Sequence, residues 1–157
     1  HIIITTSGAG VFQVENALTK NQVINHFGGK DGIDEVIFKA ERTRDGSILF
    51  ATTVDLMYQE ADSLKFGYFR PTGFPGFFLT TCMIEDSKRN IWIGKFNGGL
   101  YRFNIDSREF KYYDMRDGLV HNFISSIFED SRGQIWVGTW GGGVSLIRNG
   151  EIAVNFN

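Results

Sequence analysis

A four-residue motif occurs twice in this chain at a fixed distance, and this repetition restricts the fold more than any other feature. Ile91-Trp92-Ile93-Gly94 returns 44 residues later as Ile135-Trp136-Val137-Gly138. The flanking residues return with it, as Glu85-Asp86 and Glu129-Asp130, and as Gly98-Gly99 and Gly142-Gly143. Repeats of about 40–45 residues made of short strands are typical of β-propeller blades. Because repeated residues build the scaffold of such a protein, we expect function to lie in residues that differ between repeats.

Two weaker copies extend the repeat over all 157 residues. Residues 47–52 lie 43 positions before residues 90–95, and residues 2–6 lie 133 positions before residues 135–139, which is close to three repeats. The sequence therefore predicts one partial β-propeller over residues 1–157. Its units cover approximately residues 1–33, 34–77, 78–120 and 121–157, of which the first is incomplete.

Short apolar segments between turn residues predict an all-β fold with four strands in a complete unit. In the third unit these strands are expected at residues 79–85, 90–95, 99–104 and 109–113. The first unit holds only three, at residues 2–6, 10–14 and 23–27, so the chain has 15 strands, or about three and three-quarter blades.

An incomplete arc of blades would expose apolar faces at its ends, which favours aggregation. We therefore expect the chain to be a piece of a longer propeller, with the remaining blades as its partners. A homodimer formed through the end blades and a four-bladed ring that lacks one inner strand are the alternatives.

The strand at residues 90–95 is apolar on both of its sides, which predicts that both faces of its blade are covered. Trp92 and Trp136 are accordingly expected in the core. Gly94 and Gly138 indicate either a crowded point or a bulge. Gly99 stands at the start of a strand, where a positive φ is expected.

The composition excludes several functions. The formal net charge is −2 and no basic stripe is present, so nucleic acid is not an expected partner. The single cysteine, Cys82, excludes an internal disulfide and is expected to be a buried apolar residue. No apolar stretch is long enough for a membrane helix, so the membrane would be reached only through flanking segments. No spacing typical of metal ligands is present, and no cofactor is expected.

Paired acids can also carry catalysis, so Glu85-Asp86 and Glu129-Asp130 were considered for this role. Adjacent residues of a strand point to opposite faces, which prevents such a pair from sharing one ligand easily. We therefore expect each aspartate to bond nearby turn amides instead.

The segment from Glu129 to Thr139, followed by Gly142-Gly143-Val144, resembles the two-component regulator propeller repeat, as does the linker from Asp117 to Ile124. The last two units match this repeat well and the first two match it poorly. In the second unit, Arg42-Thr43 replaces the acidic pair.

The resemblance implies a periplasmic sensor region of a bacterial hybrid two-component system, notably in gut Bacteroidetes. Such regions are similar to receptors that detect oligosaccharides and signal through a membrane helix to a linked histidine kinase. The expected function is thus non-catalytic carbohydrate sensing. A protein-interaction scaffold is one alternative, and a propeller lyase or hydrolase that acts on a polysaccharide is another. Only three histidines are available as bases for the enzymatic alternative.

The connections between strands predict where a ligand would bind. The turns after the first and third strands of each unit are short, charged and similar between units, whereas the other connections differ. Variation on a repeated scaffold favours recognition on this second face. The alternatives are that the aromatic residues pack on a neighbouring loop and that Asn122 caps local backbone. The predicted ligand-binding residues are Trp140, Phe96, Asn97, His121, Asn122 and Asp55.

Overall fold

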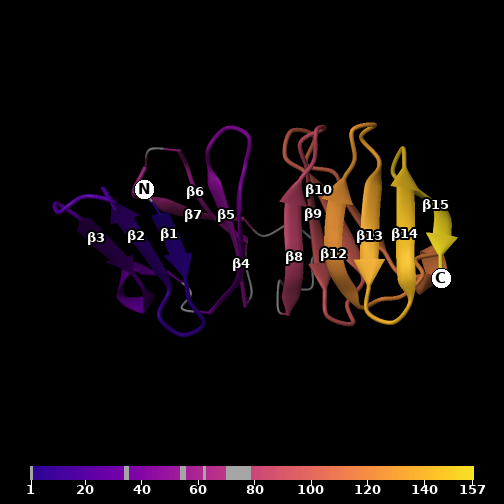
Figure 1. Ribbon diagram of the computed structural model, residues 1–157, viewed down its shortest axis with the longest axis horizontal. Helices are drawn as coiled ribbons and strands as arrows, with labels where there is room; N and C mark the ends of the chain where they lie inside the picture. Colours follow the sequence, from indigo (N-terminus) through magenta and orange to yellow (C-terminus); the bar gives the residue numbers. More distant parts are fainter. Residues whose placement is uncertain (1, 34–35, 54–55, 62, 70–78) are drawn as a thin grey trace. The chain divides into compact units, whose positions relative to one another are not determined.

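The computed structural model describes residues 2–33, 36–53, 56–61, 63–69 and 79–157, which fold into small antiparallel sheets (Figure 1). The first sheet contains β1 (Ile2–Thr5), β2 (Val11–Glu15) and β3 (Val23–Phe27). The second contains β4 (Ile37–Arg42), β5 (Ile48–Thr52), β6 (Leu56–Gln59) and β7 (Phe66–Phe69).

The third and fourth sheets follow the same plan. The third contains β8 (Thr80–Glu85), β9 (Asn90–Lys95), β10 (Leu100–Asn104) and β11 (Phe110–Tyr113). The fourth contains β12 (Ile124–Glu129), β13 (Ile135–Thr139), β14 (Gly143–Arg148) and β15 (Glu151–Phe156). Consecutive strands are neighbours in every sheet. The prediction of an all-β fold with four-stranded blades is therefore confirmed, as is the three-stranded first sheet.

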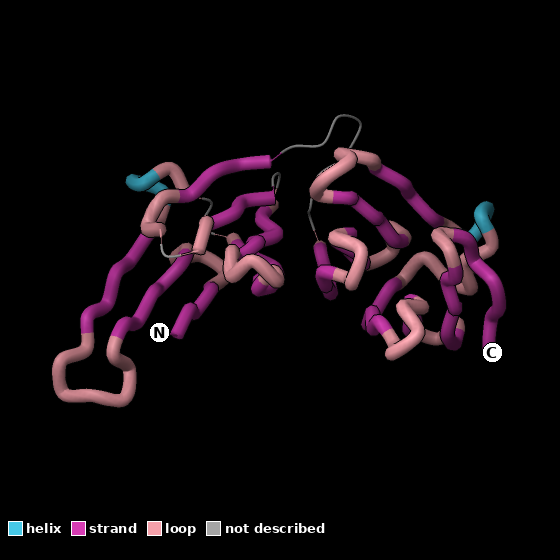
Figure 2. The backbone as a smooth tube through the Cα atoms, turned by 90° about the horizontal axis from the view of Figure 1, so that it is seen from above, coloured by secondary structure: helices cyan, strands magenta, loops and turns pink. Residues whose placement is uncertain are grey.

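The chain divides into two compact units. Unit 1 comprises residues 1–40 and 45–78, and unit 2 comprises residues 41–44 and 79–157. A 3-10 helix follows a sheet in each unit, at η1 (Gly29–Asp31) and η2 (Met115–Asp117), both drawn in cyan in Figure 2. The core of unit 1 is built from Val11, Ile33, Ile37, Ile48, Phe50 and Met57.

In unit 2, the third and fourth sheets pack face to face across one apolar core. The third sheet contributes Cys82, Trp92, Leu100 and Tyr113. The fourth contributes Ile124, Ile127, Ile135, Val137 and Ile147. Cys82 is a free, buried thiol, as the sequence predicts.

Some strands begin one residue later than the sequence predicts, and the backbone gives the reason. Leu79 has a φ of 57° and Gly99 has a φ of 70°, which are outside the β region. Strands β8 and β10 therefore start at Thr80 and Leu100. The positive φ expected at Gly99 is confirmed.

Gly94 lies at a close contact between the two sheets of unit 2. A Cβ atom at this position would lie 2.6 Å from Cys82 Sγ and 2.6 Å from Ile124 Cγ2. The register of β8 also shifts between Thr80 and Cys82, opposite this glycine. Both properties expected of Gly94, a crowded point and a bulge, are thus present.

The aspartate of each acidic pair holds the turn that follows it. Asp86 accepts hydrogen bonds from the backbone N–H groups of Lys88 at 2.8 Å and of Asn90 at 2.9 Å. It also accepts from the side chain of Asn90 at 2.7 Å and from Trp92 Nε1 at 2.7 Å. The predicted bonding of turn amides is confirmed, and the bond to the buried indole links the turn to the core as well.

The glutamate of each pair bonds a turn of the preceding repeat. Glu85 Oε2 accepts from the backbone N–H of Arg44 at 2.6 Å, and Glu129 Oε2 accepts from the backbone N–H of Ser87 at 2.8 Å. Each glutamate thus bonds the equivalent turn one repeat earlier. The acidic pair therefore recurs because one carboxylate fixes its own turn while the other fixes the next turn back along the chain.

Trp136 makes the same bond as Trp92 but is less buried. Its Nε1 donates to Asp130 Oδ2 at 2.9 Å, and its ring stacks on Phe156 with centroids 5.7 Å apart. The ring is half-buried, so the expected core position is reached only in part. The same bond lowers the pKa of the Asp130 carboxyl, since the indole donor favours the charged form.

We expect the Trp136→Phe variant to raise the pKa of Asp130 toward its ordinary value, because phenylalanine lacks the indole N–H. A depressed folded-state pKa contributes stability above the pKa of the unfolded chain, and this stability is lost as the pH falls through the folded-state pKa. The variant should therefore lose less stability over this acidic window. A pH titration of the Asp130 carboxyl carbon by NMR measures the change. The Trp140→Phe variant is the control, and an unchanged Asp130 midpoint in Trp136→Phe would contradict the assignment.

Candidate functional site

Two turns of unit 2 lie at the same end as the residues that directly precede β8 and β12. In an antiparallel meander, alternate connections lie at opposite ends of the sheet. The β9–β10 and β13–β14 turns therefore share an end with Leu79, directly before β8, and with Phe123, directly before β12. Figure 1 shows the β13–β14 turn at the lower edge of the fourth sheet, opposite the β12–β13 and β14–β15 turns.

Three aromatic side chains form a continuous row at this end, which we call the aromatic row: Phe96, Phe123 and Trp140. The rings of Phe96 and Phe123 meet edge to face with centroids 3.8 Å apart. The rings of Phe123 and Trp140 stack with centroids 5.9 Å apart and an interplanar angle of 25°. Trp140 is nevertheless 70% exposed and Phe96 is 49% exposed. The row thus presents aromatic surface to solvent although its members contact one another.

The repeated backbone fixes the outer members of the row. The N–H of Phe96 donates to the carbonyl of Leu79 at 3.0 Å, and the N–H of Trp140 donates to the carbonyl of Phe123 at 2.9 Å. These two bonds are related by the 44-residue repeat. The scaffold therefore holds both turns in the same way, while the aromatic side chains on them are free to face solvent.

His121 lies beside the row. Its Nδ1 accepts a hydrogen bond from the backbone N–H of Phe123 at 3.1 Å. In the neutral ring, this bond leaves Nε2 as the protonated nitrogen and so as a donor. A Cβ atom at Gly142 would lie only 2.6 Å from His121 Cβ, so the β13–β14 turn passes directly against this residue. His121 therefore belongs to the same surface as Trp140.

Asn122 holds local backbone. Its Oδ1 accepts from the N–H of Met115 at 2.9 Å, and its carbonyl accepts from the N–H of Gly99 at 2.9 Å. The side-chain bond is the turn-capping role that the sequence leaves open as an alternative. Asn97 is exposed beside Phe96 and has a φ of 51°. Asp55 lies outside the described residues.

The structure thus brings Phe96, Trp140 and His121 together through Phe123, a residue that the sequence analysis missed. Phe123 is the repeat partner of Leu79, and both stand directly before the first strand of a sheet. The carbonyl at this position accepts a hydrogen bond from the variable turn, so its residue lies beside that turn. An aromatic residue at this position of the repeat is the signal that could have identified Phe123.

The aromatic row and His121 together offer apolar ring faces and hydrogen-bond donors. An indole supplies an apolar face and one N–H donor, and His121 supplies a second donor. Within residues 2–33, 36–53, 56–61, 63–69 and 79–157, no group of three or more His, Cys, Asp and Glu side chains could hold a metal ion. Among these same residues, no helix is both long and apolar enough to span a membrane.

The chain has similarity to known proteins at both the sequence and the structure level. Residues 118–141 match the family model described as "Two component regulator propeller". This segment contains His121, Phe123 and Trp140. No curated protein sequence matches the chain.

Three solved structures resemble most of the chain. The extracellular domain of BT3049, described as a hybrid two component system of B. thetaiotaomicron, has a TM-score of 0.77 and 25% identity, with 99% of this chain and 20% of that chain covered. The extracellular domain of BT4673 from the same organism has a TM-score of 0.75 and 17% identity, with 94% and 22% covered.

PorZ of Porphyromonas gingivalis, described as a surface component of the type-IX secretion system, has a TM-score of 0.62 and 16% identity, with 87% and 22% covered. The chain thus spans about one fifth of the length of the structures it matches. The likenesses to BT4673 and PorZ, at lower identity, show the fold alone.

Proposed function

From the premise that the chain carries a two-component regulator propeller repeat, we propose that it is part of the extracytoplasmic sensor propeller of a bacterial two-component signalling protein. We propose further that the aromatic row binds an oligosaccharide. The observation that carries the proposal is the exposed aromatic row, which is held by repeated backbone bonds on the face where the repeats differ.

Stacking explains why a sugar suits this surface. A pyranose ring has an apolar face of C–H groups and a rim of hydroxyls, which an exposed aromatic ring and nearby donors complement. Trp140 offers its ring and its indole N–H, and Phe96 extends the apolar surface toward the third sheet. The row continues across two sheets, so it suits a chain of sugars better than a single ring.

The free face of the fourth sheet supports a longer propeller. Phe128 is 65% exposed, Phe156 is 49% exposed and Val154 is 39% exposed. A cluster of large apolar side chains on one sheet indicates a surface that another element covers. Together with the one-fifth coverage of BT3049, this face supports a further blade in the same protein as the partner of the fourth sheet.

Signalling would require a ligand that distinguishes two states of the receptor. A ligand with equal affinity for both states shifts no equilibrium. We propose that a bound oligosaccharide links the aromatic row to loops of other blades and so favours one arrangement of the receptor over another. The linked output is a histidine kinase, as in the hybrid systems that the resemblance implies.

The Trp140→Ala variant of the intact protein tests the binding site. A panel of oligosaccharides is screened by thermal shift, and the affinity of any that raises the melting temperature is measured by calorimetry. We expect the dissociation constant to rise about tenfold, since an aromatic contact contributes about 0.5–1.5 kcal/mol beyond its area. Leu18→Ala, which removes an apolar side chain that is 99% exposed in unit 1, is the control.

Each outcome separates one part of the proposal from another. Weaker binding in Trp140→Ala with normal binding in Leu18→Ala supports the aromatic row. Equal binding in all variants keeps the sensor and removes this site. If no oligosaccharide shifts the melting temperature, the carbohydrate ligand is wrong, and a protein partner on the same face becomes the hypothesis to test.

A further inference from the structure

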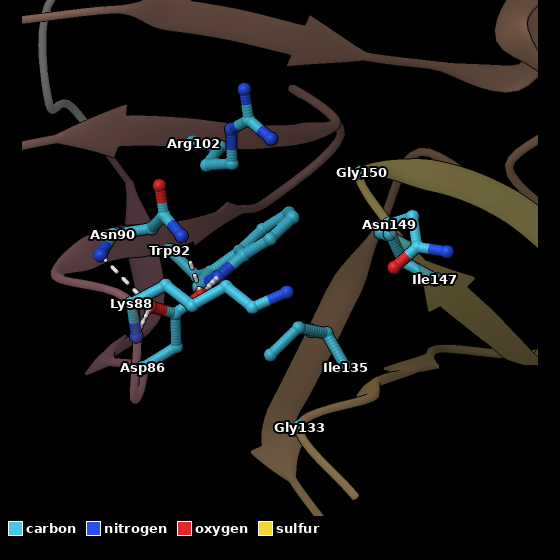
Figure 3. Close-up of a pocket in the computed structure, with 10 residues that line it drawn as sticks. All are labelled: Asp86, Lys88, Asn90, Trp92, Arg102, Gly133, Ile135, Ile147, Asn149 and Gly150. Atoms are coloured by element: carbon cyan, nitrogen blue, oxygen red, sulfur yellow. Dashed lines mark hydrogen bonds between the residues drawn. The ribbon is translucent and has the colours of Figure 1, made fainter. Parts of the chain in front are cut away.

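A concave site lies in unit 2, at the opposite end of the sheets from the aromatic row. This cleft has a volume of about 290 Å³ and is shown in Figure 3. It lies between the third and fourth sheets, beside the β8–β9 and β14–β15 turns. Its lining residues are Asp86, Lys88, Asn90, Trp92, Arg102, Gly133, Ile135, Ile147, Asn149 and Gly150.

Arg102 is the unusual member of this lining. It lies on β10 opposite Trp92 of β9, and its side chain is only 15% exposed. One guanidinium nitrogen, Nη2, donates to Glu109 Oε1 at 2.7 Å. Its Nε is buried, and among the described residues it has no hydrogen-bond partner. A buried N–H of a charged group is costly without an acceptor, so a ligand oxygen close to this guanidinium would stabilise it.

Lys88 and Asn149 supply further polar groups. Figure 3 shows the side chain of Lys88 extending into the space between the two sheets, with the amide of Asn149 on the far side. Lys88 is exposed, and within the described part of the chain no carboxylate forms an ion pair with its ammonium group. The cleft thus has two cationic side chains as donors.

The one carboxylate in the cleft does not compete for these donors. Both oxygens of Asp86 are already occupied, by the backbone N–H groups of Lys88 and Asn90 and by the side chains of Asn90 and Trp92. The groups that remain available are therefore mainly donors. Such a site favours an acceptor-rich ligand, and the ammonium group of Lys88 favours one that is negatively charged.

The walls of the cleft are fixed before any ligand binds. Tyr113 Oη donates to the carbonyl of Gly150 at 2.9 Å, and Lys111 Nζ donates to the same carbonyl at 2.9 Å. The ring of Tyr113 also stacks on Trp92 with centroids 5.7 Å apart. A site held by packed side chains loses less entropy when a ligand binds.

The repeat shows that the scaffold does not need Arg102. The equivalent position one repeat later is Leu146, a buried core residue. A leucine therefore satisfies the fold at this position of a blade, whereas an arginine adds charge and donors. By contrast, the repeat partner of Lys88 is Arg132, which does not line the cleft.

We propose that this cleft binds a carboxylate-bearing ligand of about the size of one monosaccharide, with Lys88 and Arg102 holding the carboxylate. The apolar wall of Ile135 and Ile147 would contact the body of the ligand. The volume is near the lower end of the range for small-molecule sites, about 300–1,000 Å³. This site is separate from the aromatic row and does not depend on it.

Glucuronate is the probe, because it combines a sugar ring with a carboxylate. Glucose keeps the ring without the charge, and acetate keeps the charge without the ring. Binding to the intact protein is followed by calorimetry and by the NMR signals of the Trp92 and Trp140 indole N–H groups, which report the cleft and the aromatic row respectively. We expect glucuronate to shift the Trp92 signal, with weaker binding at higher salt.

The Lys88→Met and Arg102→Leu variants should each raise the dissociation constant of glucuronate about tenfold or more, since hydrogen bonds between charged groups are stronger than neutral ones. Arg132→Met, the repeat partner of Lys88, should leave it unchanged. Equal affinity in all three variants, or a shift of Trp140 in place of Trp92, would overturn the proposal. Acetate that binds as tightly as glucuronate would overturn the monosaccharide size.

A failure of the cleft proposal can be distinguished from a failure of the proposed oligosaccharide site at the aromatic row. Trp140→Ala should leave glucuronate binding in the cleft unchanged, while Arg102→Leu should leave the binding of neutral oligosaccharides to the aromatic row unchanged. Either site can therefore fail in these measurements without the other.

Discussion

The Asp86→Ala variant is expected to lower the free energy of unfolding by about 3 kcal/mol or more, since each buried donor left without an acceptor costs about 1–3 kcal/mol. Asp86 is 3% exposed and accepts four hydrogen bonds, two of them from backbone N–H groups. Its removal would leave the indole N–H of Trp92 and the amide of Asn90 without their acceptor in the core. Urea denaturation of the variant and the parent protein measures the difference.

The second copy of the motif provides the matched control. Asp130 bonds the backbone of Arg132 and Gln134 and the indole of Trp136 in the same way, but it is half-buried. Water can replace the lost acceptor there, so Asp130→Ala should lower the free energy of unfolding by clearly less than Asp86→Ala does. An equal decrease in the free energy of unfolding in Asp86→Ala and Asp130→Ala would show that burial does not decide how much these hydrogen bonds stabilise the fold.

Gly94→Ala is expected to lower the free energy of unfolding by about 2–3 kcal/mol, because overpacking a core costs about 1–3 kcal/mol. The new methyl group would lie 2.6 Å from Cys82 Sγ and 2.9 Å from Ile124 Cβ. Ile124 is branched at this carbon and fully buried, so it cannot rotate away cheaply. The two sheets of unit 2 would have to separate slightly.

Gly138→Ala is the equivalent change on the fourth sheet. The methyl group there would meet Ser126 Oγ at 2.4 Å, the end of an exposed side chain that can rotate. We expect a loss of less than about 1 kcal/mol in this variant. Thermal and urea unfolding of both variants measure the two changes in the free energy of unfolding. A larger loss in Gly138→Ala than in Gly94→Ala would mean that the close approach of the two sheets is not what requires glycine.

Much of the fold could be predicted from the sequence because the repeat is local. Strand β9 has the predicted bounds, since its apolar residues end at a turn on each side. The start of β8 was predicted one residue too early because Leu79 is apolar and gives no sign of its positive φ. The role of Asp86 in its turn was also predictable, since the donors lie within six residues of the carboxylate.

The candidate site was predictable only in part. Trp140 and Phe96 could be selected because they vary on a repeated turn, and the structure places both in one aromatic row. Phe123 was missed because it stands at a scaffold position, and its contact with Phe96 crosses from one sheet to the next. The bonds from Glu85 and Glu129 to preceding turns were missed for the same reason.

The sequence alone thus determined the repeat, the number of strands in each sheet and the aspartate that holds each turn, because those depend on patterns within one repeat. Only the tertiary structure decided which side chains meet across units: Phe96 with Phe123, and Lys88 and Arg102 with Asn149 around one cleft. The physical reason is that these groupings depend on the distance and register between packed sheets. That packing is set by many buried side chains together, and no single segment of the sequence encodes it.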